Sequence, residues 1–93
     1  MEKLAAVTIN VPYKSAGNVI LQKEVNFEVY KDEDYYCIRP GLNEMERRLA
    51  NLPETLDFQL IDGKAVSVKG TKDGNFHVID EIVKLLRNQD ILS

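Results

Sequence analysis

A chain of 93 residues has the length of one small domain, and its 44% hydrophobic and 29% charged residues are typical of a globular protein. Fifteen acidic against twelve basic residues give a net charge of -3, which offers no electrostatic attraction to nucleic acid or to an anionic membrane. The single cysteine, Cys37, excludes an intramolecular disulfide and a cysteine-rich zinc site. Because the N-terminal segment also lacks the apolar run of a signal peptide, we expect residues 1–93 to form a single cytoplasmic domain.

Alternating apolar and polar side chains indicate the first two strands. Residues 4–11 show this period of two, and the proline that follows is expected to end the strand. Residues 12–18 contain Pro, Ser, Gly and Asn, which predicts a loop with Tyr13 at its exposed tip. Alternation resumes over residues 19–30, where Lys23 is the one charged side chain on the apolar face.

A charged turn at residues 31–34, KDED, separates the second strand from a third. Pairing Tyr30 with Tyr35 across this turn closes the apolar face, so residues 4–39 are expected to form a three-stranded antiparallel meander. On the opposite, outward face this register places two tyrosines, a cysteine and an arginine. These candidate partner-binding residues are Tyr30, Tyr35, Cys37 and Arg39.

Residues 43–52 carry the signals of a short helix. Asn43 stands as an N-cap with Glu46 three residues later, which is the spacing of a capping box. Pro53 disfavours helical geometry at the residue before it, so the helix is expected to end there. The apolar stripe expected to face the sheet consists of Met45, Leu49 and Leu52.

The clearest hairpin signal lies in residues 56–70, LDFQLIDGKAVSVKG. A two-residue turn at Asp62-Gly63 would divide the apolar side chains between the two faces of the strand pair. A three-residue loop that ends at Gly63 instead pairs Phe58 with Val66 and keeps the apolar set on one face. We therefore predict this bulged turn.

A second helix is predicted after the turn cluster at residues 71–75, with Asp73 or Asn75 as its N-cap. Close to half of its circumference is apolar, which is wider than contact with one sheet requires. Ile91 and Leu92 follow a polar break and are interpreted as a tail that folds back. The apolar face of this helix consists of Phe76, Val78, Ile79, Ile82, Val83, Leu85 and Leu86.

The order βββ-α-ββ-α predicts an α+β two-layer sandwich, in which a five-stranded antiparallel sheet carries two helices on one face. The order of the strands stays open, because the meander and the hairpin can join by either edge. This element order, short of a leading helix, resembles that of the class I type III secretion chaperones, which are small acidic dimers. The resemblance covers topology alone.

The chain carries no pattern of catalytic, metal-binding or nucleotide-binding residues. Cys37 and His77 are the candidates for a thiol and imidazole pair, but neither has a neighbouring acid, base or glycine-rich turn to activate it. The carboxylates of residues 32–34 lack the length, the glycine and the terminal glutamate of a helix-loop-helix calcium loop. The glycines follow no phosphate-loop spacing. We therefore expect no cofactor, no metal and no enzymatic activity.

Two alternatives stay open beside a protein-interaction role. A small ligand or substrate would use the groove between the sheet and the helices. An RNA strand would need a basic strip and stacking aromatics, and both the acidic balance and the missing aromatic-glycine signature argue against it. The basic strip would consist of Arg47, Arg48, Lys64, Lys69 and Lys72.

The leading hypothesis is a non-enzymatic protein-interaction module that forms a homodimer or binds another protein. The outward sheet face carries Ile20, Tyr30, Tyr35 and Cys37 among polar residues, and tyrosine is enriched at interface cores. The wide apolar face of the last helix on so small a core points the same way. Neither a nucleic-acid nor a membrane partner is expected.

Overall fold

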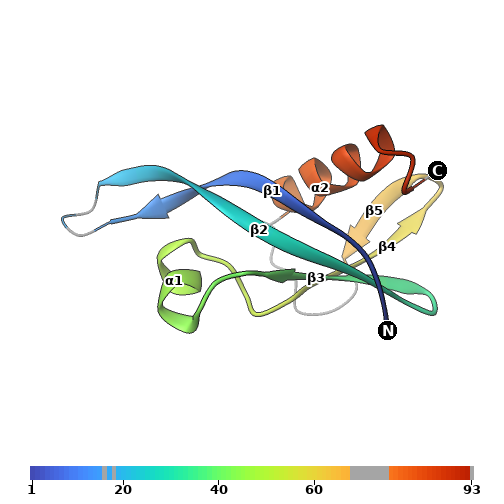
Figure 1. Cartoon of the computed structure of the whole chain (residues 1–93), viewed down its shortest axis with the longest axis horizontal. Helices are drawn as coiled ribbons and strands as arrows, with labels where there is room; N and C mark the ends of the chain where they lie inside the picture. The colour runs from blue at the N-terminus through green and yellow to red at the C-terminus, as the bar shows by residue number, and fades with distance from the viewer. Residues whose placement is uncertain (16, 18, 68–75, 93) are drawn as a thin grey trace.

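The structure is a computed structural model that describes residues 1–15, 17, 19–67 and 76–92. Its element order is βββ-α-ββ-α, which confirms the α+β class predicted from the sequence (Figure 1). The elements are β1 (Glu2–Lys14), β2 (Ile20–Asp32), β3 (Tyr35–Pro40), α1 (Glu44–Leu49), β4 (Leu56–Ile61), β5 (Lys64–Ser67) and α2 (Phe76–Asn88).

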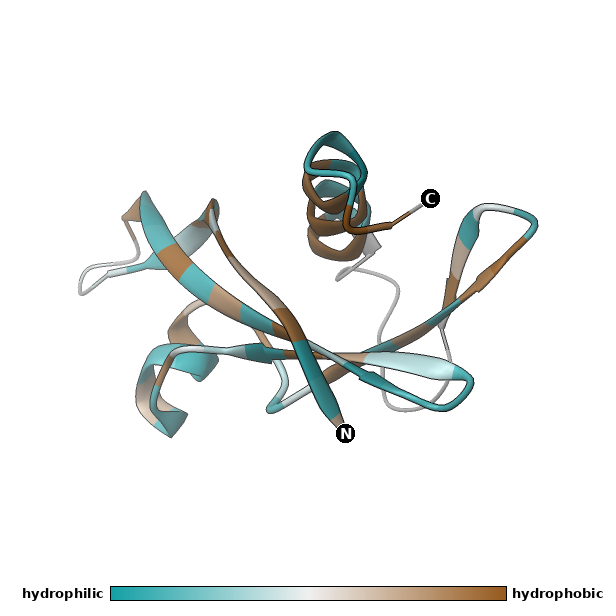
Figure 2. Cartoon of the chain, turned by 45° about the vertical axis from the view of Figure 1, so that its right-hand side comes forward, coloured by the Kyte–Doolittle hydropathy of each residue, from teal (hydrophilic) through white to brown (hydrophobic). Residues whose placement is uncertain are grey.

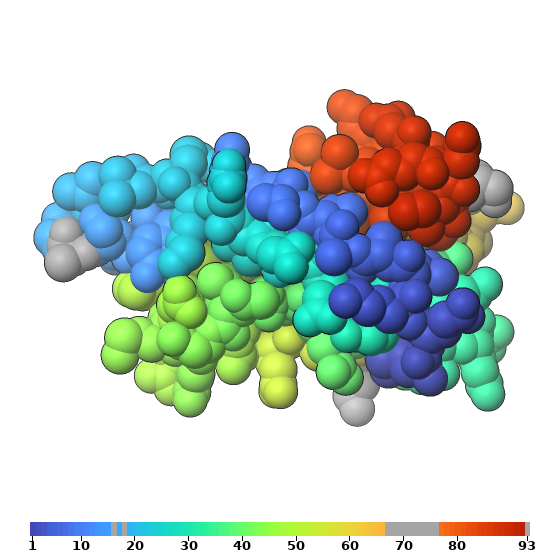
Figure 3. All heavy atoms as spheres, viewed as in Figure 1, coloured from blue at the N-terminus to red at the C-terminus, as the bar shows by residue number. Residues whose placement is uncertain are grey.

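The five strands form one antiparallel sheet in the order β1-β2-β3-β4-β5, which answers the question that the sequence left open. Strand β3 pairs with β2 only from Phe27 to Asp32. The two long strands β1 and β2 therefore continue past β3, and the end of their hairpin projects from the body of the protein (Figures 1 and 3).

Helix α2 lies in the concave face of the curled sheet (Figure 2). It contacts both β1 and β5, which are the two edge strands, so the sheet wraps around the helix. The apolar face of α2 was expected to be wider than contact with one sheet requires, but the curled sheet contacts more of the helix than a flat sheet would. The face is buried within the chain at Val78, Ile79, Ile82, Val83 and Leu86. Each such aliphatic side chain contributes about 1.5–3 kcal/mol when fully removed from water.

Both helices end in the same way, with a left-handed residue that is not glycine. Asn51 has φ 56° after α1 and Asp90 has φ 58° after α2, and Asn and Asp are among the residues that tolerate this conformation. After α2, the Ile91 amide donates to the Leu86 carbonyl at 2.9 Å, which turns the chain back. Leu92 is buried as a result, and the predicted fold-back of the tail is confirmed.

Helix α1 begins with the predicted capping box. The Asn43 side chain accepts from the Glu46 amide at 2.8 Å, and the Glu46 carboxylate accepts from the Asn43 amide at 3.1 Å. The predicted apolar stripe is wrong at Met45, which is 72% exposed, and no residue within α1 is buried. Leu52 is buried as predicted, and Ala50, which also follows the helix, joins it in the core. The six residues of α1 are too few to present a continuous apolar face.

Strand β1 is longer than predicted. Pro12 does not end it, because β1 is an edge strand and the register continues through Pro12 opposite Gln22. Tyr13 is correspondingly not a loop tip. It lies in the strand, half-buried, with the Lys23 ammonium 4.6 Å from the centre of its ring.

The turn between β2 and β3 is shorter than predicted. Asp32 pairs with Tyr35 and Tyr30 pairs with Cys37, so the expected pairing of Tyr30 with Tyr35 is wrong. The tight turn is made possible by Glu33, which has φ 40°. Because the error is a shift of two residues, every side chain stays on the face that the sequence predicted.

The turn between β4 and β5 is also a two-residue turn, and the predicted bulged register is wrong. Gln59 rather than Phe58 pairs with Val66, while the predicted partner of Leu56, Val68, lies outside the described residues. Asp62 and Gly63 both have positive φ, at 53° and 80°, which is the type I′ geometry that matches the twist of paired strands. Local turn geometry therefore outweighs the gain from placing Val66 inside.

The corrected register predicts different responses to one substitution at two positions. Val66→Thr should change the free energy of unfolding by less than about 0.5 kcal/mol, because Val66 is 41% exposed. Val29→Thr should lower it by about 1–3 kcal/mol, because Val29 is fully buried and the new hydroxyl would lose its water. Urea unfolding of dilute protein measures both. Equal losses of unfolding free energy at the two positions would show that Val66 is buried, as the bulged register requires.

Candidate functional site

The four residues predicted as a partner-binding row do share the outer, convex face of the sheet. Lys3, Tyr30, Cys37 and Asp57 follow one another across β1, β2, β3 and β4, and Arg39 stands opposite Glu28 in the neighbouring row. Their exposure differs. Tyr30 and Tyr35 are half-buried, Arg39 is exposed, and Cys37 is only 4% exposed.

Tyr30 is held by a small polar cluster on this face. Its hydroxyl donates to the Glu28 carboxylate at 2.8 Å, and the Lys3 ammonium lies 3.1 Å from the same carboxylate oxygen. The Arg39 guanidinium lies 5.2 Å from the centre of the Tyr30 ring. The hydrogen bond from Tyr30 and the ammonium of Lys3 lower the pKa of Glu28, and the same bond to Glu28 raises the pKa of Tyr30.

Tyr35 makes a separate interaction of the same kind. Its hydroxyl donates to the Asp32 carboxylate at 3.1 Å, and this bond raises the pKa of Tyr35. The two tyrosine hydroxyls therefore each bind a carboxylate of β2. Their rings remain partly accessible to solvent.

Cys37 is a buried thiol on β3, opposite Asp57 of β4. Burial first, and then hydrogen bonding to the Asp57 carboxylate, raise the pKa of Cys37 to about 11, while Arg39 opposes the shift. A thiol with so high a pKa carries almost no thiolate at neutral pH and is a poor nucleophile.

Two apolar side chains on the outer face were missed by the sequence reasoning. Ile61 is 52% exposed and Val66 is 41% exposed, and the strand register places both on the face that carries Tyr35. The predicted bulge had turned Val66 inward. The Asp62-Gly63 dipeptide, a strong signal for a two-residue turn, was the observation that could have found them.

We call Tyr30, Tyr35, Ile61 and Val66 the outer patch. Of the described elements, α2 lies on the concave side of the sheet, away from this patch (Figure 2). The patch contains two aromatic and two aliphatic side chains, and it is surrounded by charges of both signs. Those charged neighbours are Lys3, Glu28, Asp32, Arg39, Asp57 and Lys64.

The other candidate residues are dispersed. His77 lies on α2 and lines a cavity on the inner side of the sheet, so the structure does not bring it to Cys37 on the outer face. Arg47 and Arg48 lie on α1 and Lys64 lies on β5, at different ends of the protein (Figure 1). Lys69 and Lys72 fall outside the described residues, as do the predicted caps of α2. Within the described part of the chain, no three His, Cys, Asp or Glu side chains gather as metal ligands would.

No protein-family model, curated protein or solved structure matches this chain. The resemblance to type III secretion chaperones therefore rests on element order alone. In the described residues, no helix combines the length and the apolar character needed to cross a membrane.

The environment of Cys37 predicts slow reaction with thiol reagents. Labelling of the native protein should be much slower than labelling in urea, because the thiolate is scarce and the side chain is covered. The rate should rise about ten-fold per pH unit up to about pH 11, since only the thiolate reacts. Native labelling as fast as in the unfolded chain would show that the burial of Cys37 is wrong.

Proposed function

We propose that this protein is a non-enzymatic interaction module that forms a homodimer through the outer face of its sheet. The observation that carries the proposal is the outer patch, which puts two half-buried tyrosines and two exposed aliphatic side chains on one face. Tyrosine and aliphatic groups supply the apolar centre of protein interfaces, and charged groups form the rim.

The tyrosine hydroxyls of the patch and part of its charged rim are already paired within the chain. The Tyr30 and Tyr35 hydroxyls donate to Glu28 and Asp32, and Glu28 also pairs with Lys3. Removing a polar group from water costs free energy mainly when it loses hydrogen bonds. A face whose polar groups keep their partners can therefore be covered by another surface at a smaller cost than a face of free charges.

A second copy of the chain is the partner that this face fits. The rim carries both cations and anions, so a two-fold rotation can bring Lys3 or Arg39 of one copy near Glu28 or Asp32 of the other. Two sheets that pack face to face lie about 10 Å apart with interdigitated side chains, and the outward tyrosines of β2 and β3 would take part in such packing.

The absence of catalysis and a cytoplasmic location belong to the same proposal. The high pKa of Cys37 removes the one thiol nucleophile, and His77 lies on α2, on the other side of the sheet from that thiol. A single buried free cysteine fits a reducing compartment.

Sedimentation equilibrium tests the proposal with matched variants. The wild-type chain should sediment as a dimer at high concentration, and the double variant Ile61→Thr/Val66→Thr should weaken association by roughly ten-fold or more, because it removes the aliphatic half of the patch. Tyr35→Ser should act in the same direction. Thermal unfolding of each variant at low concentration shows whether the fold is retained.

The control is Ile20→Thr. Ile20 is 68% exposed, more than either Ile61 or Val66, but it lies at the end of the β1–β2 hairpin. Its replacement should leave association unchanged. A monomer at all concentrations, or a dimer broken by Ile20→Thr and not by the double variant, would reject the outer patch as the dimer interface.

A further inference from the structure

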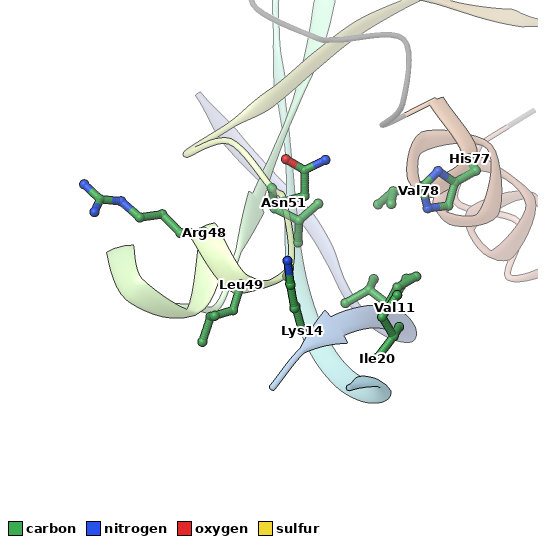
Figure 4. Close-up of a pocket in the computed structure, with 11 residues that line it drawn as sticks. Val11, Lys14, Ile20, Arg48, Leu49, Asn51, His77 and Val78 are labelled. Atoms are coloured by element: carbon green, nitrogen blue, oxygen red, sulfur yellow. The ribbon is translucent and has the colours of Figure 1, made fainter. Parts of the chain in front are cut away.

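A cavity of about 410 Å³ lies at the end of the β1–β2 hairpin, between the hairpin and the two helices. Three parts of the chain meet there: the end of the β1–β2 hairpin, the residues at the end of α1, and the start of α2 (Figure 4). The cavity is separate from the outer patch, and its volume falls in the range of roughly 300–1,000 Å³ that is typical of small-molecule sites.

The floor of the cavity is apolar and fixed in place. Val11, Leu52 and Val78 line it, and all three are buried members of the hydrophobic core. Their positions are set by packing on the other side, so the floor needs no rearrangement to receive a ligand. Ile20 extends the apolar wall toward solvent.

Every ionisable side chain that lines the cavity is basic. Among the described residues these are Lys14, Arg48 and His77, and no aspartate or glutamate of the described residues lines the cavity, although the chain as a whole carries a net charge of -3. Arg48 is already paired with Glu44 at 2.8 Å, and its side chain extends away from the other labelled residues (Figure 4). Lys14 and His77 make no ion pair with any described residue, and they approach from β1 and from α2.

We propose that this cavity binds a small organic anion with an apolar body, of the medium-chain carboxylate class. The hydrocarbon chain lies against Val11, Leu52 and Val78, and the carboxylate lies at the mouth between Lys14 and His77. An apolar floor favours a hydrocarbon body over inorganic phosphate, which would leave that floor exposed to water. The excess of basic groups at the mouth favours an anion over a cation or a neutral chain. This site is independent of the proposed dimer interface.

The test uses octanoate as the probe and octyltrimethylammonium as its cationic match. Titration calorimetry should show saturable binding of octanoate with one site per chain, and at least roughly ten-fold weaker binding of the cation. Amide chemical shifts in a two-dimensional NMR spectrum should move on octanoate addition at Val11, Ala50, Leu52 and Val78, which surround the cavity.

Variants at the two basic side chains that make no ion pair with described residues locate the anion. The double variant Lys14→Gln/His77→Gln should weaken octanoate binding at least roughly five-fold, while Lys84→Gln should not change it. Lys84 is an exposed cation of the same helix as His77, but it lines a different cavity. Lys14 and His77 are themselves exposed, so their replacement should leave the fold intact.

Three results would overturn the assignment. One is equal binding of octanoate and octyltrimethylammonium, which would leave only hydrophobic adsorption. Another is chemical-shift change confined to residues of β4 and β5, remote from this cavity. The third is the absence of saturable octanoate binding. Sedimentation tests the dimer, whereas calorimetry and NMR test the cavity. The two proposals can therefore fail independently.

Discussion

The seating of α2 in the concave face of a curled sheet is the constraint on which the rest of the structure depends. The helix contacts the first and the last strand of the sheet, so one helix closes the core against both edges. A wide apolar face, which a flat sheet would leave half exposed, is thereby buried at Val78, Ile79, Ile82, Val83 and Leu86. The hydrophobic core therefore lies on one side of the sheet, between the sheet and α2.

The difference in length between the strands and the helix explains the cavity. Strands β1 and β2 have 13 residues each and are about 43 Å long at 3.3 Å per residue, whereas the 13 residues of α2 span only about 20 Å. The helix therefore covers about half of the hairpin. Beyond it, α1 is attached through the Lys23 ammonium, which lies 2.9 Å from the Glu46 carboxylate. The gap between the end of α1 and the start of α2 is the cavity.

The sequence predicted well which face of the sheet most side chains occupy, but it predicted the pairing registers of the strands poorly. The reason is physical. A period of two assigns each side chain to a face, and the outward positions of Tyr30, Tyr35, Cys37 and Arg39 followed from it correctly. Register depends on the turns. The left-handed residue Glu33 has no strong pattern in a single sequence, and the strong Asp62-Gly63 turn signal was given less weight than the apolar pattern of the flanking strands. An error of two residues left the β2–β3 faces intact, whereas the one-residue error at the β4–β5 turn moved Val66 to the wrong side.

The local signal at the start of α1 was reliable, whereas the predicted end of α1 was three residues too late and long-range packing could not be predicted. The capping box of Asn43 and Glu46 needs only neighbouring residues, so it was predictable. The role of Lys23 depends on α1 lying beside β2, which no local pattern reveals. The sheet curl that buries the wide face of α2 is likewise a tertiary property. The aliphatic half of the outer patch was missed because the bulged turn was preferred to a two-residue turn at Asp62-Gly63. A groove between the sheet and the helices was expected, but the residues that line the cavity could not be predicted.

The central claim is that one sheet face is filled by the chain itself and the other is left for a second copy. The most direct measurement is the relaxation enhancement that a soluble paramagnetic reagent causes at methyl groups, compared at low and high protein concentration. We expect the methyl groups of Ile61 and Val66 to be relaxed strongly in dilute protein and to be protected at high concentration, while those of Val19 and Ile20 stay accessible throughout. Protection of Val19 and Ile20 alone, or no change at any of the four, would contradict the account.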